Sequence, residues 1–232
     1  MTYSGRHAVL TVSAALSALL SFGASNAAAQ DLAEVPEGCQ PVATVHKNGC
    51  ATTTISQCSD ATWQAVSYRR GKPLGTLSYD RDWGFFKWQT HESNKLTLEL
   101  VPGTGTAMSR AALLETGRHD ASGEFRLTTN IIEGQPYILT GNTEKTGATE
   151  VISGETYTFY KARRLFEREV GKGGLSFEVD VLIAEDRDLM IEGRWSRSVM
   201  GGNEEVFEFA PRAIARPGDS GFLATLSEYG CE

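Results

Sequence analysis

The segment LSFEVDVLI, residues 175–183, decides the fold class of this protein. Its odd-numbered positions are apolar, and most of the positions between them are polar or charged. A two-residue repeat is typical of a β-strand, in which alternate side chains lie on opposite faces. After turn-forming residues at 185–188, the alternation resumes over 189–195, and a second turn at 201–203 leads to the apolar segment 206–209. The pattern predicts three consecutive antiparallel strands, each with one buried and one solvated face.

The same alternation recurs along much of the chain, with turn signals such as Gly71-Lys72-Pro73 between the segments. About ten or more short strands joined by tight turns are typical of a meander. The predicted fold is therefore all-β and mainly antiparallel, either a meander barrel or a two-sheet sandwich. The further segments expected to form strands are 51–57, 62–70, 74–80, 84–90, 96–100, 107–114, 124–131, 136–140 and 221–227.

One segment departs from the two-residue repeat. Between residues 158 and 170, apolar side chains at 159, 162, 165, 166 and 170 follow helical spacing, and Arg163 and Glu167 form an i,i+4 pair. Gly171 stands where such a helix would end. This spacing favours one short helix over 158–170. The alternative is a long strand that continues from Glu155.

The first 29 residues have the three parts of a secretory signal peptide. Arg6 stands at the front, an uncharged run extends from 8 to 24, and three alanines at 27–29 supply a small-residue cleavage site. The first cysteine, Cys39, follows Pro36-Glu37-Gly38 and does not lie in a lipid-attachment motif. We expect the signal to be cleaved and the mature chain to be soluble, without a membrane span, in the periplasm or secreted.

The charge pattern argues against a nucleic-acid partner. Without residues 1–29 the chain has 21 Lys and Arg against 29 Asp and Glu, a net charge of −8, with the signs alternating locally. Nucleic-acid binding needs a basic stripe. The one basic cluster comprises Lys161, Arg163, Arg164 and Arg168. It is interleaved with Glu167 and Glu169 and is interpreted as a solvated face.

Four cysteines in an exported chain predict two disulfides. Three pairings are open from the sequence alone. The favoured pairing joins Cys50 to Cys58 across a short loop and Cys39 to Cys231 across the ends of the domain. Residues 30–50 are then expected to be a disulfide-pinned lead-in to a single β-rich domain at 51–232.

The residues 218–221, Gly-Asp-Ser-Gly, resemble the nucleophile motif of chymotrypsin-like serine proteases. The resemblance covers four residues, and the rest of the family's pattern is missing. No histidine stands in the Ala-Ala-His-Cys setting of that family, since His46 is followed by Lys-Asn-Gly. Only residues 221–232 follow Ser220, too few for the family's specificity pocket. The composition of the motif predicts a turn.

No residue pattern predicts a catalytic or metal centre. His46, His91 and His119 lack the spacing of a metal site, and the acidic segments 80–82 and 185–188 lack the glycine and terminal glutamate of a calcium loop. Phosphate-cradling glycine loops are absent from the sequence as well. We expect no cofactor, no metal and no catalytic residues.

Aromatic residues at 83–88 and at Trp195 are the candidate ligand-binding group. In a regular strand, Phe86 and Trp88 face one way, and Trp83 and Phe85 face the other. Aromatics on both faces indicate that one face is covered by protein or is available to a ligand. We predict ligand contacts at Trp83, Phe85, Phe86, Trp88 and Trp195, the alternative being an ordinary packed core.

The function expected from these features is non-catalytic binding of an apolar or aromatic-stacked ligand, such as a lipid or a sugar, in a calycin-like barrel or a sandwich. One alternative is an interaction module, an assembly factor or inhibitor, that contacts another envelope protein through its surface. A hydrolase with a dispersed site is the third class. The first two differ in the interior, because a ligand-binding protein needs an aromatic-lined cavity and an interaction module needs an exposed apolar patch.

Overall fold

A computed structural model describes residues 32–91, 95–168, 174–184, 186–199 and 201–231. The signal peptide predicted at 1–29 lies outside these residues. The described chain forms 13 strands and one short helix. The strands are β1 (Cys39–Lys47), β2 (Ala51–Cys58), β3 (Trp63–Arg69), β4 (Lys72–Tyr79), β5 (Phe85–Thr90), β6 (Thr97–Leu100), β7 (Arg118–Thr128), β8 (Gln135–Ile152), β9 (Glu155–Glu167), β10 (Gly174–Ala184), β11 (Leu189–Val199), β12 (Glu205–Phe207) and β13 (Pro211–Ala215), and the helix is α1 (Arg110–Thr116).

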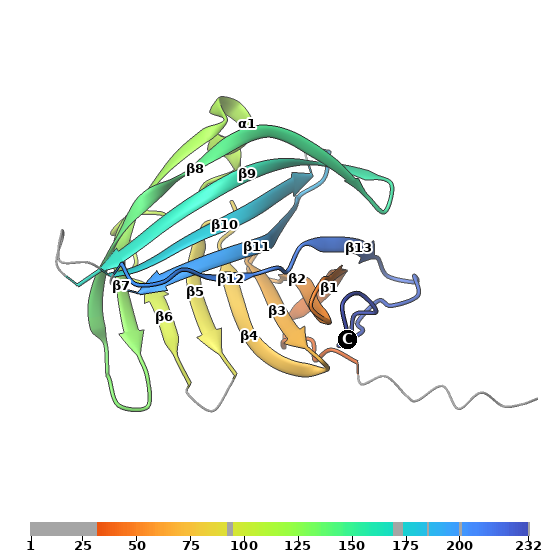
Figure 1. Ribbon diagram of the computed structural model, residues 1–232, viewed down its shortest axis with the longest axis horizontal. Coiled ribbons are helices and arrows are strands. Elements are labelled where there is room, and N and C mark those ends of the chain that lie inside the picture. Colours follow the sequence, from red (N-terminus) through yellow and green to blue (C-terminus); the bar gives the residue numbers. More distant parts are fainter. Residues whose placement is uncertain (1–31, 92–94, 169–173, 185, 200, 232) are drawn as a thin grey trace, which may run out of the picture.

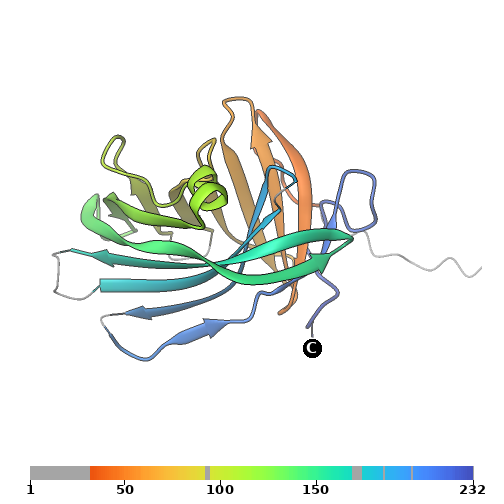
Figure 2. The same ribbon diagram turned by 90° about the horizontal axis from the view of Figure 1, so that it is seen from above.

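All thirteen strands belong to one antiparallel sheet in the order β12-β11-β10-β9-β8-β7-β6-β5-β4-β3-β2-β1-β13. From β1 to β12, each strand pairs with its neighbours in the chain, as a meander requires. The sheet curls strongly, with the early strands facing β9 to β11 across its interior (Figures 1 and 2). The all-β antiparallel prediction is confirmed, and the single curled sheet follows the barrel alternative and not the two-sheet sandwich.

The two edge strands, β12 and β13, are consecutive in the chain, so residues 208–210 lead from one edge of the sheet to the other. Side chains connect the two ends of the sheet where they approach each other. Lys47 of β1 donates a hydrogen bond from Nζ to the backbone carbonyl of Glu192 on β11 (2.7 Å). Pro211 of β13 packs against Gly193 of β11, where a Cβ would lie 3.2 Å from Pro211 Cδ. Curling therefore brings β1 and β13 against β11.

The hairpin predicted from residues 175–195 is present as β10 and β11, with Leu175 opposite Val199 and Ala184 opposite Leu189. The odd-numbered residues of β10 from Val179 to Ile183 are buried in the core. A bulge between Val179 and Val181 shifts the register, so that Val181 lies opposite Glu192. This shift places the Glu192 side chain on the inner face of the sheet.

The segment 158–167 is strand and not helix, because it lies within β9 (Glu155–Glu167), the alternative considered above. Residues 169 and 170 lie outside the described residues. Tyr160, Ala162 and Phe166 are buried in alternation along this strand, which pairs with both β8 and β10. Two long neighbouring strands thus override a short helical pattern, since the backbone of 158–167 pairs with β10 along its whole length and with β8 on either side of a bulge.

The helix occurs instead at Arg110–Thr116, overlapping the segment 107–114 that was wrongly predicted as a strand. Ser109 is the N-cap, and its Oγ accepts a hydrogen bond from Ala112 N (3.1 Å). Gly117 ends the helix in the left-handed conformation, at φ 76°. A capping serine, a run of good helix formers and a terminal glycine are helix signals that the alternation argument overlooked. The strand predicted at 221–227 is also wrong, because that segment forms turns with one isolated bridge at Ala224.

The predicted disulfide pairing is wrong. The disulfides join Cys39 to Cys58 and Cys50 to Cys231, not Cys50 to Cys58 and Cys39 to Cys231. Cys39 and Cys58 face each other at the open end of the β1–β2 hairpin. Cys50 lies at its turn, roughly 25 Å from Cys58 at the strand rise per residue, far beyond disulfide reach.

Cys50 also hydrogen-bonds to the C-terminal segment, since its backbone N donates to the carbonyl of Tyr229 (2.8 Å). This segment covers the outer face of β1 and β2, where Leu223 N donates to Thr44 Oγ1 (2.8 Å) and Ser227 Oγ donates to the carbonyl of Lys47 (2.9 Å). Two disulfides indicate an oxidising compartment. Within the described residues, no helix has the length and apolar character that crossing a membrane requires.

Candidate functional site

The interior of the curled sheet has a packed end beside α1. Trp83 is 1% exposed and stacks on Trp63, with ring centroids 4.4 Å apart. Its Nε1 donates to Asp188 Oδ1 (2.9 Å). Leu113 of α1 joins the same core, and its carbonyl accepts a hydrogen bond from the Tyr160 hydroxyl (3.3 Å). The predicted ligand contact at Trp83 therefore lies in packed core.

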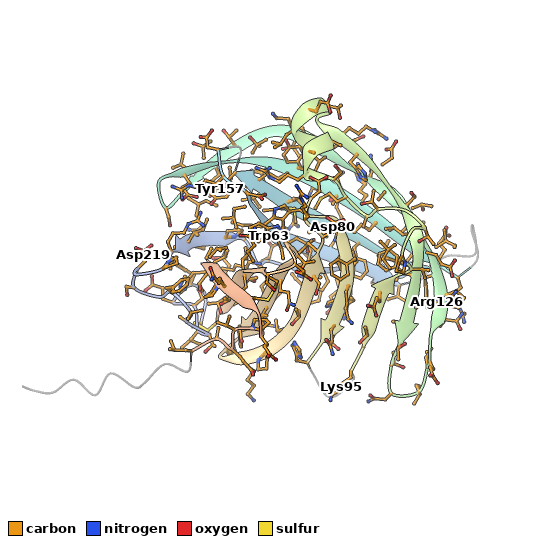
Figure 3. The ribbon with its side chains drawn as sticks, turned by 180° about the vertical axis from the view of Figure 1, so that it is seen from behind. Trp63, Asp80, Lys95, Arg126, Tyr157 and Asp219 are labelled. Atoms are coloured by element: carbon orange, nitrogen blue, oxygen red, sulfur yellow. A yellow bond between two sulfur atoms is a disulfide. The ribbon has the colours of Figure 1, made fainter. Side chains whose placement is uncertain are left out.

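The other end of the interior holds a cavity of about 470 Å³, a size typical of small-molecule sites. Figure 3 labels Trp63 and Asp80 near the middle of the molecule and Lys95 at the opposite end of the sheet from α1. The lining side chains come from strands on both sides of the curl. The apolar and aromatic ones are Ala51, Tyr68, Leu74, Leu77, Phe85, Trp88, Leu96, Leu98, Phe166, Phe177, Val179, Trp195, Phe207 and Phe209.

A continuous row of aromatic rings crosses the cavity wall. Trp88 of β5 meets Phe177 of β10 edge-on, with centroids 6.0 Å apart. Phe177 contacts Trp195 of β11 at 6.1 Å, and Trp195 stacks on Phe207 of β12 at 3.9 Å and 12° between planes. The row joins one side of the curled sheet to the other. It offers ring edges and faces to an aromatic or apolar ligand.

Phe85 and Trp88 both line the cavity, which contradicts the strict alternation expected across this strand. The reason is a bulge: Tyr79 pairs with Phe85, while Ser78 pairs with Lys87. The extra residue, Phe86, reverses the direction of the side chains that follow it. Of the five predicted ligand contacts, Phe85, Trp88 and Trp195 surround the cavity, and Trp83 and Phe86 do not belong to its lining.

A buried polar cluster stands among the apolar lining residues. Arg164 of β9 is 6% exposed and donates from Nη2 to Glu192 Oε1 (3.0 Å). Its guanidinium also lies over the Phe85 ring, 5.4 Å from the centroid. Lys47 is 7% exposed and donates to the Glu192 carbonyl. Tyr79 is buried close enough to Glu192 for the carboxylate to raise the pKa of its hydroxyl.

The environment of this cluster shifts the titration of two of its members. Burial lowers the pKa of Lys47 to about 8, and the nearby Glu192 carboxylate opposes the shift only in part. Burial and Glu192 together raise the pKa of Tyr79 well above its ordinary value. Burying the charged ammonium of Lys47 at this position therefore costs solvation free energy.

The cavity opens toward solvent between less buried residues. Arg69 is exposed and lies over Phe209, 5.7 Å from the ring centroid. Arg197 is half-exposed, pairs with Glu205 (2.8 Å) and lies over Phe207 at 5.4 Å. The inner end thus has buried cations, and the mouth has exposed ones.

Sequence reasoning missed the polar cluster. Arg164 was predicted to lie with its neighbours on a solvated face, but it is buried. Arg163 and Lys161 of the same strand are less buried and form ion pairs with Glu178 and Asp180. A two-residue repeat through 160, 162, 164 and 166 would have assigned Arg164 to the inner face. Lys47 and Glu192 had no such local signal, because the curl of the sheet alone brings them together.

The protease-like motif lies in the turns that follow β13, beside His46. His46 Nε2 donates to the Gly221 carbonyl (3.0 Å), so this nitrogen carries the proton and is not a base for Ser220. His46 and Ser220 line a second cavity of about 470 Å³ beneath the C-terminal segment, and Ser220 lies in an exposed turn. Among the described residues, no group of three or more His, Cys, Asp or Glu side chains is arranged to hold a metal ion.

The curled sheet and its cavity define a disulfide-bonded, open β-barrel with an aromatic interior. Comparisons with protein-family models, with curated proteins and with solved structures found no match for this chain. The argument for function therefore depends on the site itself.

Proposed function

We propose that this protein is an exported, non-catalytic binding protein that holds a small apolar or aromatic ligand inside its curled sheet. The observation that carries the proposal is the cavity of about 470 Å³ lined by Phe85, Trp88, Phe177, Trp195 and Phe207. Its lining is mainly apolar and aromatic with a few polar groups, and it opens to solvent, as ligand pockets commonly do. Rigid aromatic walls bind planar or extended apolar molecules with little loss of side-chain entropy.

The location of the protein outside the cytoplasm is part of the proposal. The two disulfides are stable in an oxidising compartment, and the signal-like residues 1–29 direct a chain to export. We assign the mature protein to the periplasm or the extracellular space. A ligand-binding role there requires no nucleotide and no metal.

The interaction-module alternative has weaker support. It needs a filled interior and a contiguous apolar patch on the surface. The exposed large apolar side chains among the described residues are spread over several elements, including Ile131, Val151 and Val199. The hydrolase alternative has weaker support as well, because His46 Nε2, near the Gly-Asp-Ser-Gly turn, donates to a backbone carbonyl.

A cavity-blocking variant tests the proposal. Leu77 is half-buried on β4 and lines the cavity, so Leu77→Trp places an indole in the ligand space. We expect this change to weaken binding of N-phenyl-1-naphthylamine, an uncharged apolar fluorophore, by about tenfold or more, because steric exclusion removes most of its buried contact. The measurement is a fluorescence titration of the purified mature protein.

Gln89→Trp is the matched control, because Gln89 is exposed on the neighbouring strand β5 and does not line the cavity. This control is expected to bind the fluorophore like the unmodified protein. Equal affinity in both variants would place the fluorophore elsewhere on the molecule. No binding by the unmodified protein would refute an apolar binding role for the cavity.

A further inference from the structure

The charges inside the cavity do not balance. Among the described residues that line it, four are cationic and one, Glu192, is acidic. The cations are Lys47, Arg69, Arg164 and Arg197. The chain as a whole carries a net charge of −7, so the excess of positive charge is local to the cavity and opposite to the general composition. Such a site attracts anions into a protein that otherwise repels them.

The two innermost cations share a single carboxylate. Arg164 pairs with the Glu192 side chain, and Lys47 donates its hydrogen bond to the backbone carbonyl of Glu192. One positive charge in this buried group thus lacks a negative partner among the lining residues. Buried charges are normally paired, because an unpaired one loses its hydration without compensation.

Arg164 also retains an unused donor. Its Nε has no hydrogen-bond partner although the residue is 94% buried, that is 6% exposed. An orphaned donor of a buried charged group costs free energy that a ligand acceptor recovers on binding. The Nε and Nη groups of a guanidinium form a planar fork that matches a carboxylate, phosphate or sulfonate.

We infer that the cavity binds an anionic amphiphile, a molecule with an apolar or aromatic body and one acidic head group, with the head group at Arg164 and Lys47. This inference rests on the proposed function and deepens it by naming the ligand class. The aromatic row from Trp88 to Phe207 holds the apolar body. The body then extends from the buried cations toward the mouth, where Arg69 and Arg197 lie.

A pair of matched fluorophores isolates the head group. N-phenyl-1-naphthylamine and 1-anilinonaphthalene-8-sulfonate share one aromatic body, and only the second carries a sulfonate. We expect the unmodified protein to bind the sulfonate about tenfold more tightly than the neutral compound, because charge-assisted hydrogen bonds in a buried site are strong. Both affinities are measured by fluorescence titration.

Arg164→Met is expected to remove this preference by lowering the sulfonate affinity about tenfold, with little change for the neutral compound. Arg163→Met is its control: the same charge is lost from the adjacent residue of β9, which is exposed and pairs with Glu178 outside the cavity. Lys47→Met is the second test and is paired with Lys87→Met on the outer face, where Lys87 contacts Glu99. If Arg164→Met does not fold, the relative affinity of Lys47→Met for the two fluorophores tests the head-group assignment.

The outcomes separate the two proposals. An unchanged preference for the sulfonate in Arg164→Met and Lys47→Met, or equal loss in the outer-face controls, overturns the head-group assignment. Equal affinity of the unmodified protein for both fluorophores also overturns the head-group assignment. The proposed binding of an uncharged apolar ligand in the cavity would then still stand. Failure to bind either compound refutes the proposed function itself.

Discussion

Replacing Cys50 and Cys231 together with alanine is expected to lower the free energy of unfolding by about 5 kcal/mol. The bridge spans 181 residues, nearly the whole described chain, and therefore removes a large conformational entropy from the unfolded state. It also fastens the C-terminal segment over β1 and β2, where Tyr229 accepts the hydrogen bond from Cys50 N. Urea denaturation followed by tryptophan fluorescence measures the loss.

The second disulfide provides the comparison. Cys39→Ala with Cys58→Ala opens a bridge of 19 residues and is expected to cost about 3 kcal/mol, since the closed loop is much shorter. Peptide mapping without reduction checks the pairing itself, because a peptide joining Cys39 to Cys58 exists only in the connectivity described here. A larger loss from the shorter bridge would contradict the loop-entropy account.

Lys47→Met is expected to stabilise the protein at pH 7 by up to about 3 kcal/mol. Burial lowers the pKa of Lys47 to about 8 from its ordinary value of 10.5. Between these two values the unfolded chain binds more protons than the folded chain, so stability rises as the pH increases from about 8 to 10.5. Below pH 8 the full cost of burying the ammonium is present. A methionine of similar length avoids that cost.

The pH dependence of the free energy of unfolding distinguishes the cost of burying the Lys47 charge from a general packing effect. The unmodified protein should gain stability between pH 8 and 10.5, and Lys47→Met should lack that part of the gain. Lys87→Met, on the outer face, should keep it. Urea titrations at pH 7, 8, 9 and 10 measure all three proteins. Equal pH slopes for Lys47→Met and the unmodified protein would show that Lys47 is not the source.

The cost of Lys47 fits the inferred ligand. A group that lowers stability is retained most readily where it contributes to function. Lys47 and Arg164 are the two buried cations of the cavity, and each is expected to favour an acidic head group. Lys47→Met should therefore gain stability and lose the preference for the anionic fluorophore in the same molecule.

Local patterns were sufficient for the fold class. The alternation at residues 175–195 predicted the β10–β11 hairpin, and frequent turn signals predicted a meander of antiparallel strands. The same type of local signal was present but overlooked at two places. Asn48-Gly49 is a hairpin turn that sets Cys39 opposite Cys58, and Ser109 with Gly117 delimits α1.

The sequence pointed to the aromatic rings but not to their place in the fold, because large rings on a strand are compatible with either a packed core or a cavity wall. Which rings belong to the cavity depends on the bulge at Phe86 and on the packing of Trp83 against Trp63. A bulge shifts the direction of every later side chain by one position. The spacing of residues along the sequence does not show where it falls.

The sequence by itself determined that this chain forms antiparallel strands, because side-chain alternation depends on neighbours two residues apart. Tertiary structure alone decided what the interior contains. The twist accumulated over thirteen strands curls the sheet and places Lys47 of β1 against Glu192 of β11, 145 residues later. Arg164 then completes the cluster from β9. Charged residues that are far apart in the sequence therefore line one buried cationic pocket, because the curl of the sheet brings their strands together.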